Sequence, residues 1–240
     1  MEFKPQTSVS KSRSHLLQGI QAGLPIFLGY FPIAIAFGAL AVQAQFNWTE
    51  AVLMSLIVFA GASQFVGVSM FLAGAGAAQI IIATFFLNMR HLIMSLAVND
   101  QMRKFTVGWK GFLSFFITDE TFALLTLGGG EGQSEPRTPT YMAGLMITSY
   151  LGWVSGTAVG GLGAGFIPAE ITTAMTVGLY GLFIGLLVPP ARKSISFAVI
   201  ALCSMILNWV LGLIVDTGWA IVLATIVAAG LGIILIKEDV

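Results

Sequence analysis

The chain carries very little charge. Only 9% of its 240 residues are charged, 57% are hydrophobic, and the formal net charge is zero. Soluble domains carry about 25% charged residues, so this composition, with a mean hydropathy of +0.91, predicts an integral membrane protein. The sequence has none of the basic patches that nucleic-acid binding requires, and we expect no nucleic-acid partner.

Cysteine and histidine are almost missing as well. The chain has one cysteine, Cys203, which cannot form an internal disulfide, and two histidines, His15 and His91, that are far apart. One cysteine and two distant histidines do not form the closely spaced ligand pairs that are typical of metal sites. The glycine runs at 128–130 and 160–165 neither follow a strand nor precede a Lys-Ser/Thr pair, so they carry no nucleotide fingerprint. We therefore expect neither a metal nor a cofactor.

What the sequence does contain is long apolar runs. A helix needs about 20 apolar residues to span a bilayer, and lipid offers no partner to free backbone groups, so spanning segments must be helical. The sequence has eight such runs, near 17–44, 50–72, 77–98, 111–127, 141–164, 170–189, 195–214 and 218–236. We predict an all-α integral membrane protein with seven or eight helical segments.

The polar stretches between these runs indicate how the chain is organised. Residues 1–15 are polar and basic, and the apolar run that follows is too long for a cleavable signal peptide, so we predict a cytoplasmic N-terminal tail. Residues 16–240 would form one transmembrane domain. The glycine- and proline-rich stretch 128–140 would be a loop that joins two halves, 16–127 and 141–236.

The two halves resemble each other at an offset of 120 residues. In both, a glutamate follows an aromatic-containing break and opens the second apolar segment. The offset pairs Tyr30 with Tyr150, Glu50 with Glu170, Gly61 with Gly181 and Asn88 with Asn208. This pattern predicts an internal duplication.

Basic residues constrain the topology, because cytoplasmic loops are enriched in Lys and Arg. If all eight segments span, the basic residues at 103–110 fall outside the cell, against this rule, whereas those at 192–193 fall inside. If the second segment of each half instead enters and leaves on the same side, both groups fall inside. Both termini are then cytoplasmic, and the halves are inverted relative to each other, as in many transporters. Both arrangements are compatible with the sequence.

The third apolar segment carries a polar face and a charge. Thr84, Asn88, His91 and Ser95 fall at i, i+4, i+7 and i+11, on one narrow face of a helix, and Arg90 points roughly 200° away. A charge at that depth costs about 2.5–3.5 kcal/mol on insertion scales, so we expect Arg90 to have a partner. The polar face either lines a pathway or bonds neighbouring helices together. We favour the second role for Thr84 and Ser95 and the first for Asn88 and His91.

The fourth apolar segment carries Asp119 and Glu120 side by side. On a helix their side chains point about 100° apart, so they cannot both face one partner. We expect one carboxylate to neutralise Arg90 and the other to face the pathway as a candidate proton carrier. A purely structural ion pair is the alternative.

Prolines and a glutamine mark the first two segments. Pro25 and Pro32 are expected to break the first helix, because proline removes a backbone donor. Free backbone around residues 29–32 would then hold the charged ends of a zwitterion, although a simple kink is the alternative. In the second segment Gln64, next to small residues, is too polar to face lipid.

Four stretches in order, GLPIFLGYFPIAIAFG, SLIVFAGASQF, NMRHLIMS and TDETFAL, resemble those of the AzlC family, the large subunits of bacterial branched-chain amino acid exporters. The resemblance covers the chain from about residue 19. It implies export of Leu, Ile and Val, with Met as a further candidate, by secondary transport in the bacterial inner membrane. It also implies a partner, a small and separately encoded AzlD-type membrane subunit.

The resemblance implies a branched-chain amino acid exporter, and the ionisable residues within apolar segments add the expectation of proton coupling; we do not expect an enzyme. An intramembrane enzyme would need a further convergent catalytic set, such as an HExxH motif, which the sequence lacks. An exporter of another small solute and a structural or regulatory membrane subunit are the remaining alternatives. The physical reading assigns substrate binding to Tyr30, Gln64, Asn88, Arg90 and Asn208, and proton coupling to His91, Asp119 and Glu120.

Overall fold

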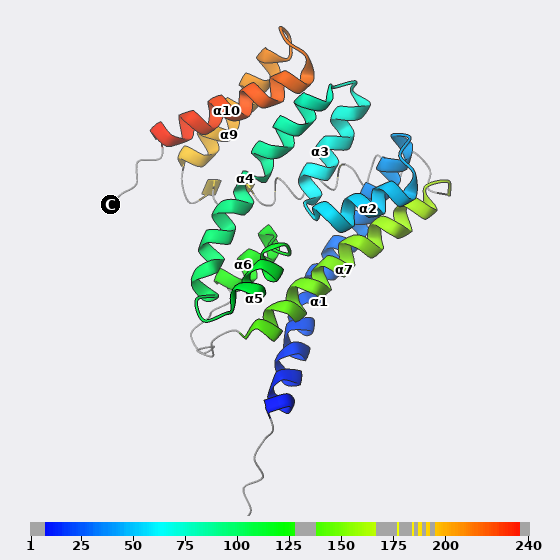
Figure 1. Ribbon diagram of the computed structural model, residues 1–240. Coiled ribbons are helices and arrows are strands. Elements are labelled where there is room, and N and C mark those ends of the chain that lie inside the picture. Colours follow the sequence, from blue (N-terminus) through cyan, green and yellow to red (C-terminus); the bar gives the residue numbers. More distant parts are fainter. Residues whose placement is uncertain are drawn as a thin grey trace, which may run out of the picture. The chain divides into compact units, whose positions relative to one another are not determined.

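The computed structural model is helical throughout the part of the chain that it describes, which comprises residues 8–127, 138–166 and 195–235 with a few positions between 177 and 192 (Figure 1). The elements are α1 (Ser8–Gln43), α2 (Trp48–Val58), α3 (Gly61–Leu72), α4 (Ala77–Gln101), α5 (Val107–Ser114), α6 (Asp119–Leu127), α7 (Pro139–Gly163), α9 (Ile195–Leu211) and α10 (Thr217–Leu235). The all-α prediction is confirmed. Most of the predicted 128–140 loop and of the 170–189 segment, including Glu170 and Gly181, lie outside the described residues.

Two described helices are long and apolar enough to cross a bilayer, Ser14–Gln43 within α1 and Ala77–Gln101 of α4. The second and fourth predicted segments are different, because each is divided in two. The second becomes α2 and α3, with 11 and 12 residues. The fourth becomes α5 and α6, with 8 and 9 residues. At 1.5 Å per residue each piece covers about 40–60% of a 30 Å hydrocarbon core. The prediction of a continuous helix was therefore wrong for the fourth segment, whereas the division of the second is compatible with the alternative in which that segment enters and leaves on the same side.

The chain divides into two compact units. The first unit combines residues 1–61 with 89–166, and the second combines 62–88 with 167–240. The predicted duplication into half-repeats remains a prediction, because its pairs at 170 and 181 fall among residues that are not described.

The first unit is built on the pairing of α1 with α7, which run side by side (Figure 1). Their backbones approach so closely that a Cβ atom at Gly160 would lie 2.0 Å from the carbonyl oxygen of Ile35. Small residues permit such contact between membrane helices, and dispersion along the whole seam stabilises the pair. The glycines that share this close approach are Gly19, Gly23 and Gly38 of α1 and Gly144, Gly152, Gly156 and Gly160 of α7.

The two helices run in the same direction. Gly19, early in α1, lies against Tyr141 at the start of α7, whereas Gly38 lies against Gly161 near its end. Inverted halves would set their first helices antiparallel, so this packing contradicts the inverted arrangement. The positive-inside argument pointed to a re-entrant segment, but it could not indicate that the fourth segment, rather than only the second, is divided.

The prolines do not break α1, which continues from Ser8 to Gln43 with Pro25 and Pro32 inside it. Both prolines are exposed, while Gly23 and Ala34 on the opposite side are buried against α7. Packing against a neighbour supports proline inside membrane helices, so the expected unwound backbone at 29–32 is not formed. The breaks occur instead in the second and fourth segments.

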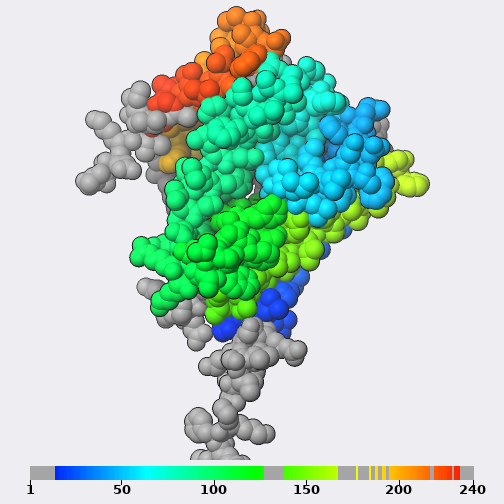
Figure 2. Space-filling model, viewed as in Figure 1, coloured from blue at the N-terminus to red at the C-terminus, as the bar shows by residue number. Residues whose placement is uncertain are grey.

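The short helices α2, α5 and α6 cover one face of the α1–α7 pair (Figure 2). Glu50 lies in the first turn of α2, as the sequence predicted, and its carboxylate accepts a hydrogen bond from the backbone N–H of Asn47 at 2.7 Å. The acid therefore both satisfies a free amide and complements the positive end of the helix dipole.

The second unit has its own apolar core. Met70 of α3, Ala83 of α4 and Val222 of α10 are buried together. Helices α9 and α10 pack against each other as a hairpin, joined by a turn at residues 212–216. These contacts hold the turns of this unit in fixed positions.

Candidate functional site

The break in the second segment is lined with aromatic rings. Phe59 has a left-handed backbone, with φ 39° and ψ 47°, and ends α2. Its ring lies edge-on to Tyr30 of α1 at 6.3 Å and to Tyr150 of α7 at 5.0 Å between centroids. A non-glycine residue in this conformation costs about 1–2 kcal/mol, and burial of the ring offsets that cost. The break between α2 and α3 is thus held against the middle of the α1–α7 pair.

The break in the fourth segment approaches the same two helices. The ring of Phe116 lies 5.2 Å from that of Tyr150, and the hydroxyl of Tyr30 bonds to Oγ1 of Thr118 at 2.8 Å. At the other end of the segment, Nε2 of Gln101 donates to the carbonyl oxygen of Leu125 at 2.8 Å. Because α5 begins just after Gln101, α5 and α6 form a hairpin that leaves the end of α4 and returns to it.

Helix α6 begins at this break with a strongly capped N-terminus. The backbone N–H of Thr118 donates to Oγ1 of Thr121 at 2.9 Å, and Asp119 and Glu120 occupy the first turn. Carboxylates are favourable beside the free amides of a helix start. The two acids predicted to lie within a continuous segment therefore sit at the start of a helix, where their charge is partly offset.

Arg90 of α4 pairs with Asp119. The guanidinium Nη1 lies 2.9 Å from Oδ2 of the carboxylate, and the two side chains are 32% and 25% exposed. The Nε atom of Arg90 is buried and has no hydrogen-bond partner among the described residues. The expectation that Arg90 has a partner is confirmed, and the partner is Asp119.

Glu120 has a different kind of partner, because its carboxylate accepts a hydrogen bond from the hydroxyl of Tyr30. Within the described ranges Glu120 makes no ion pair. Tyr30 has one proton to donate, so when it donates to Glu120 it must accept from Thr118, whose Oγ1 lies 2.8 Å away. We call Tyr30, Arg90, Thr118, Asp119 and Glu120 the central cluster.

This hydroxyl chain has two possible directions. With Glu120 ionised, protons point from Thr118 to Tyr30 and from Tyr30 to Glu120. With Glu120 protonated, the carboxyl can donate to Tyr30, Tyr30 to Thr118, and Thr118 to Oγ1 of Thr121 at 3.2 Å. The protonation state of one carboxylate therefore sets the direction of the hydroxyl hydrogen bonds that link Glu120, Tyr30 and Thr118.

An aromatic shell surrounds the cluster on the α7 side. Trp153 is buried and lies 5.8 Å from the ring of Tyr30, at an interplanar angle of 82°. A Cβ atom at Gly61 would lie 2.5 Å from this tryptophan ring, so there is no room for a side chain at this first residue of α3. The shell keeps the surroundings of the cluster apolar, which strengthens its charged and hydrogen-bonded contacts.

Five of the residues predicted from the sequence belong to the first unit. Tyr30, Arg90, Asp119 and Glu120 are brought together as two bonded pairs. His91 follows Arg90 on α4 and is half-buried. Their predicted roles in substrate binding and proton coupling remain predictions.

The other three predicted residues belong to the second unit. Gln64 is buried in α3, at 2% exposure. Asn88 is half-buried on α4, and Asn208 is exposed on α9. Their assignment to substrate binding is likewise still a prediction.

Sequence reasoning missed two buried residues, Thr118 and Thr121. Thr118 bonds to Tyr30, and the two threonine hydroxyls bond to each other. A signal for them was present. Threonine followed by two acids is the pattern of a helix N-terminus, and TDET places it within an apolar run. Read in that way, the sequence would have indicated the break.

In the residues that the structure describes, no group of three or more His, Cys, Asp or Glu side chains is arranged to hold a metal ion. The central cluster offers a guanidinium already paired with one carboxylate and a second carboxylate bonded to a hydroxyl.

Comparison with known proteins gives several relatives. The AzlC protein family matches residues 25–167, more than half of the chain. An uncharacterized membrane protein of Archaeoglobus fulgidus is 32% identical over 208 residues, covering 84% of this chain and 89% of that protein. Inner membrane protein YgaZ of Escherichia coli is 28% identical, with 82% of each chain covered.

A more distant relative is the branched-chain amino acid transport protein AzlC of Bacillus subtilis, 26% identical over 60% of this chain and 56% of its own. No solved structure matches the chain. The matched region contains the whole central cluster and the breaks in both divided segments. The chain is a membrane protein that belongs to the AzlC family.

Proposed function

We propose that the protein is a secondary transporter subunit that exports branched-chain amino acids, Leu, Ile and Val with Met as a further candidate, and couples export to proton movement. Family membership and the name of the Bacillus subtilis relative, a branched-chain amino acid transport protein, support the substrate class. The observation that carries the mechanism is the meeting of two carboxylates, one paired with Arg90 and one with Tyr30, where two divided segments approach α1 and α7.

Substrate binding would begin with an exchange at Arg90. Asp119 holds the guanidinium at 2.9 Å, while Nε is buried without a partner in the described part of the chain. A substrate carboxylate would compete with Asp119 for this cation, since Arg binds carboxylates through paired donors. Tyr30, which lies in the same unit as Arg90, would complete this part of the binding site, and the rings of Phe59, Tyr150 and Trp153 would accept the branched side chain. The substrate-binding roles of Gln64, Asn88 and Asn208, which belong to the second unit, remain predictions.

Proton coupling would operate at Glu120. Its only hydrogen-bond partner in the described ranges is the neutral hydroxyl of Tyr30, so its charge is not cancelled as that of Asp119 is. Ionisable groups inside membranes are typical of proton relays. Reversal of the hydrogen bonds among Glu120, Tyr30 and Thr118 would transmit the protonation state of Glu120 to the start of α6. His91 and Asp119 would take part in the same proton coupling.

The proposed topology follows from the parallel pairing of α1 and α7 and from the α5–α6 hairpin. With the N-terminus inside, α1 leaves the cytoplasm, α4 returns to it, and the hairpin opens on the cytoplasmic side. This places Arg103, Lys104 and Lys110 inside, in agreement with the positive-inside rule. We place the protein in the bacterial inner membrane, with both termini cytoplasmic and with a small AzlD-type membrane subunit as partner.

The test uses proteoliposomes containing the full chain, with and without the small subunit. They are preloaded with leucine, a pH gradient is imposed, and efflux is compared between the wild type, Glu120→Gln and His91→Ala. Gradient-dependent efflux that both variants lose, in protein that still assembles, supports the proposal. Efflux that survives Glu120→Gln would refute the assigned proton site, and the absence of leucine flux with the wild type would refute the substrate class.

A further inference from the structure

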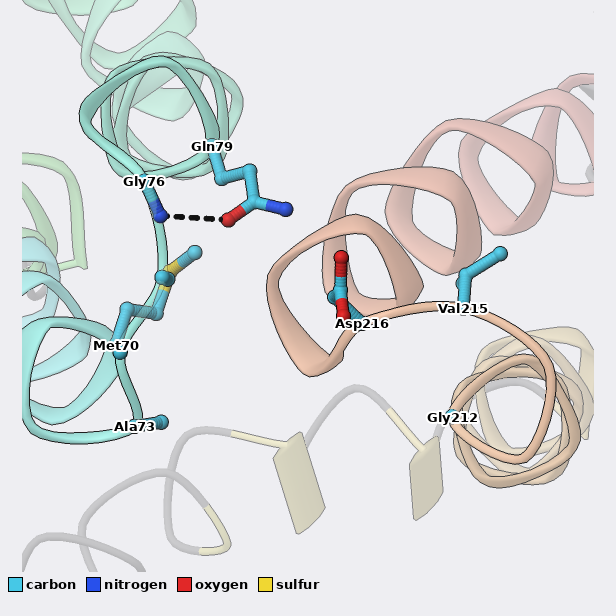
Figure 3. Close-up of a pocket in the computed structure, with 9 residues that line it drawn as sticks. Met70, Ala73, Gly76, Gln79, Gly212, Val215 and Asp216 are labelled. Atoms are coloured by element: carbon cyan, nitrogen blue, oxygen red, sulfur yellow. Dashed lines mark hydrogen bonds between the residues drawn. The ribbon is translucent and has the colours of Figure 1, made fainter.

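A pocket that the central cluster does not use lies in the second unit, between the turns of two helical hairpins (Figure 3). Its volume is about 510 Å³, within the range of pockets that bind small molecules. Residues 73–76, between α3 and α4, line one side, and Gly212, Val215 and Asp216, between α9 and α10, line the other.

Gln79 supplies a fixed donor to this pocket. Its side chain is only 9% exposed, and its Oε1 accepts the backbone N–H of Gly76 at 2.8 Å. An N–H group can only donate, so this bond fixes which end of the amide is oxygen. The Nε2 group then points across the pocket toward Asp216 (Figure 3), and it has no hydrogen-bond partner in the described part of the chain.

Asp216 supplies a carboxylate from the opposite side. It precedes α10, and its backbone carbonyl accepts the N–H of Ala220 at 2.9 Å. The described residues provide neither a cation nor a hydrogen-bond donor to its side chain. A carboxylate near a helix start has a structural use through the dipole, but its direction into the pocket, facing the amide of Gln79, leaves it available to a ligand (Figure 3).

The rest of the lining decides what would bind. The turn's own amides are used internally, since Gly74 donates to Phe71 and Ala75 to Met70, at 3.0 and 2.9 Å. The lining is mostly polar: it offers the carboxylate of Asp216 and the side-chain amide of Gln79, and Met70 and Val215 supply a small apolar part. An anion alone would be repelled by Asp216, whereas an ammonium group would be attracted to it.

From this arrangement we propose that the pocket is a second, peripheral site for an aliphatic α-amino acid, with the ammonium group on Asp216 and a carboxylate oxygen on Nε2 of Gln79. The apolar side chain would lie against Met70 and Val215. The inference rests on the proposed function, because an amino acid is the ligand that such a transporter would present here.

The site lies at the opposite end of α4 from Arg103 and Lys104 in the chain. With those residues in the cytoplasm, the turn at 73–76 faces outward, so the site would hold the amino acid that export delivers. Binding the ligand's carboxylate through a single neutral donor makes such a site weak, which suits release.

The experiment measures binding of three probes to the full chain with its small subunit in nanodiscs. The probes are leucine, leucinol, which lacks the carboxylate, and 4-methylpentanoate, which lacks the ammonium group. We expect Asp216→Asn to weaken leucine and leucinol at the weaker of two sites by about tenfold or more. Gln79→Leu should weaken leucine but not leucinol, and 4-methylpentanoate should not bind there. Asp100→Asn, which alters an exposed acid already paired with Arg103, is the matched control.

A second variant guards against misfolding. Val215→Trp would fill the pocket without removing either polar group, and it should abolish the weak site in protein that elutes as the wild type does. Titrations of Asp216→Asn and Val215→Trp that match the wild type would overturn the inference while leaving export intact. If leucine binding depends on Asp216 and Gln79 but the protein exports no leucine, the proposed export function is refuted and the proposed second site is supported. A wild type that binds none of the probes at a second site would also overturn it.

Discussion

The two divided segments differ in what fills their breaks. At the break between α2 and α3, Phe59 adopts a left-handed backbone and packs between two tyrosines, with Gly61 against Trp153. At the break between α5 and α6, threonines cap the new helix and two acids find separate partners. We infer from this difference that the aromatic break fixes the position of the chain, whereas the charged break carries the groups to which the proposed function assigns a change of protonation state.

The largest expected effect is the difference between Glu120, in the first turn of α6, and Glu50, in the first turn of α2. Glu120→Gln should reduce gradient-driven leucine flux to the level of empty liposomes, because the variant keeps the hydrogen bond to Tyr30 but cannot exchange a proton. Glu50→Gln, at the exposed start of α2, is the control and should keep its flux. Equal losses in both variants would contradict the division of roles.

A double-mutant cycle on Arg90 and Asp119 should give the next largest effect. Arg90→Met or Asp119→Leu alone leaves a charge inside the membrane without its partner, so each should unfold more readily than the double variant. We expect a coupling energy of about 1–3 kcal/mol, measured by unfolding in mild detergent. The pair Asp100–Arg103, with side chains 67% and 78% exposed, is the control and should couple by about 0–1 kcal/mol.

The aromatic break should respond in stability rather than in mechanism. Gly61→Leu places a side chain where a Cβ atom would lie 2.5 Å from the Trp153 ring, and such overpacking costs about 1–3 kcal/mol. The melting temperature should fall while flux per folded molecule is retained. Gly111→Ala, whose added Cβ would meet nothing within 4 Å, should be neutral. If the Gly61→Leu variant had normal stability but lost flux, the break between α2 and α3 would have a direct role in transport.

The smallest expected effect concerns Thr118. Thr118→Val keeps the shape of the side chain but removes a hydrogen bond to Tyr30, at a cost of about 1 kcal/mol. We expect a modest loss of stability, together with a changed dependence of flux on pH, because the hydroxyl chain would end at Tyr30. Thr118→Ser should restore both properties. If Thr118→Val left the pH dependence of flux unchanged, the direction of the hydrogen bond between Tyr30 and Thr118 would have no role in transport.

The helical class and the need for a partner at Arg90 could be predicted because composition and the cost of a charge in lipid determine them. The position of the breaks could not be predicted from hydropathy, since FAGASQF and TDETFAL remain apolar enough to pass for continuous helix. Proline misled the prediction in the other direction. The exposed positions of Pro25 and Pro32 depend on contact with α7, more than a hundred residues away in the chain, and no local pattern encodes that contact.

The choice between two acids for Arg90 shows a similar limit. Adjacent residues on a helix point in different directions, which predicted that only one carboxylate would pair with Arg90. Which one does so depends on where α6 begins, and that follows from the cap at Thr118 and from Tyr30 on another helix. Tyr30 and Tyr150, which the predicted repeat pairs, each contact the ring of Phe59.

The glycine seam between α1 and α7 also has a consequence for biosynthesis. About 100 residues separate the end of α1 at Gln43 from the start of α7 at Pro139. At translation rates of about 5–20 residues per second, α1 waits about 5–20 s for its partner. During that interval its glycine face is covered only by lipid or by an insertion factor, so a ribosome that stalls before α7 would leave an unpaired helix for membrane proteases to remove.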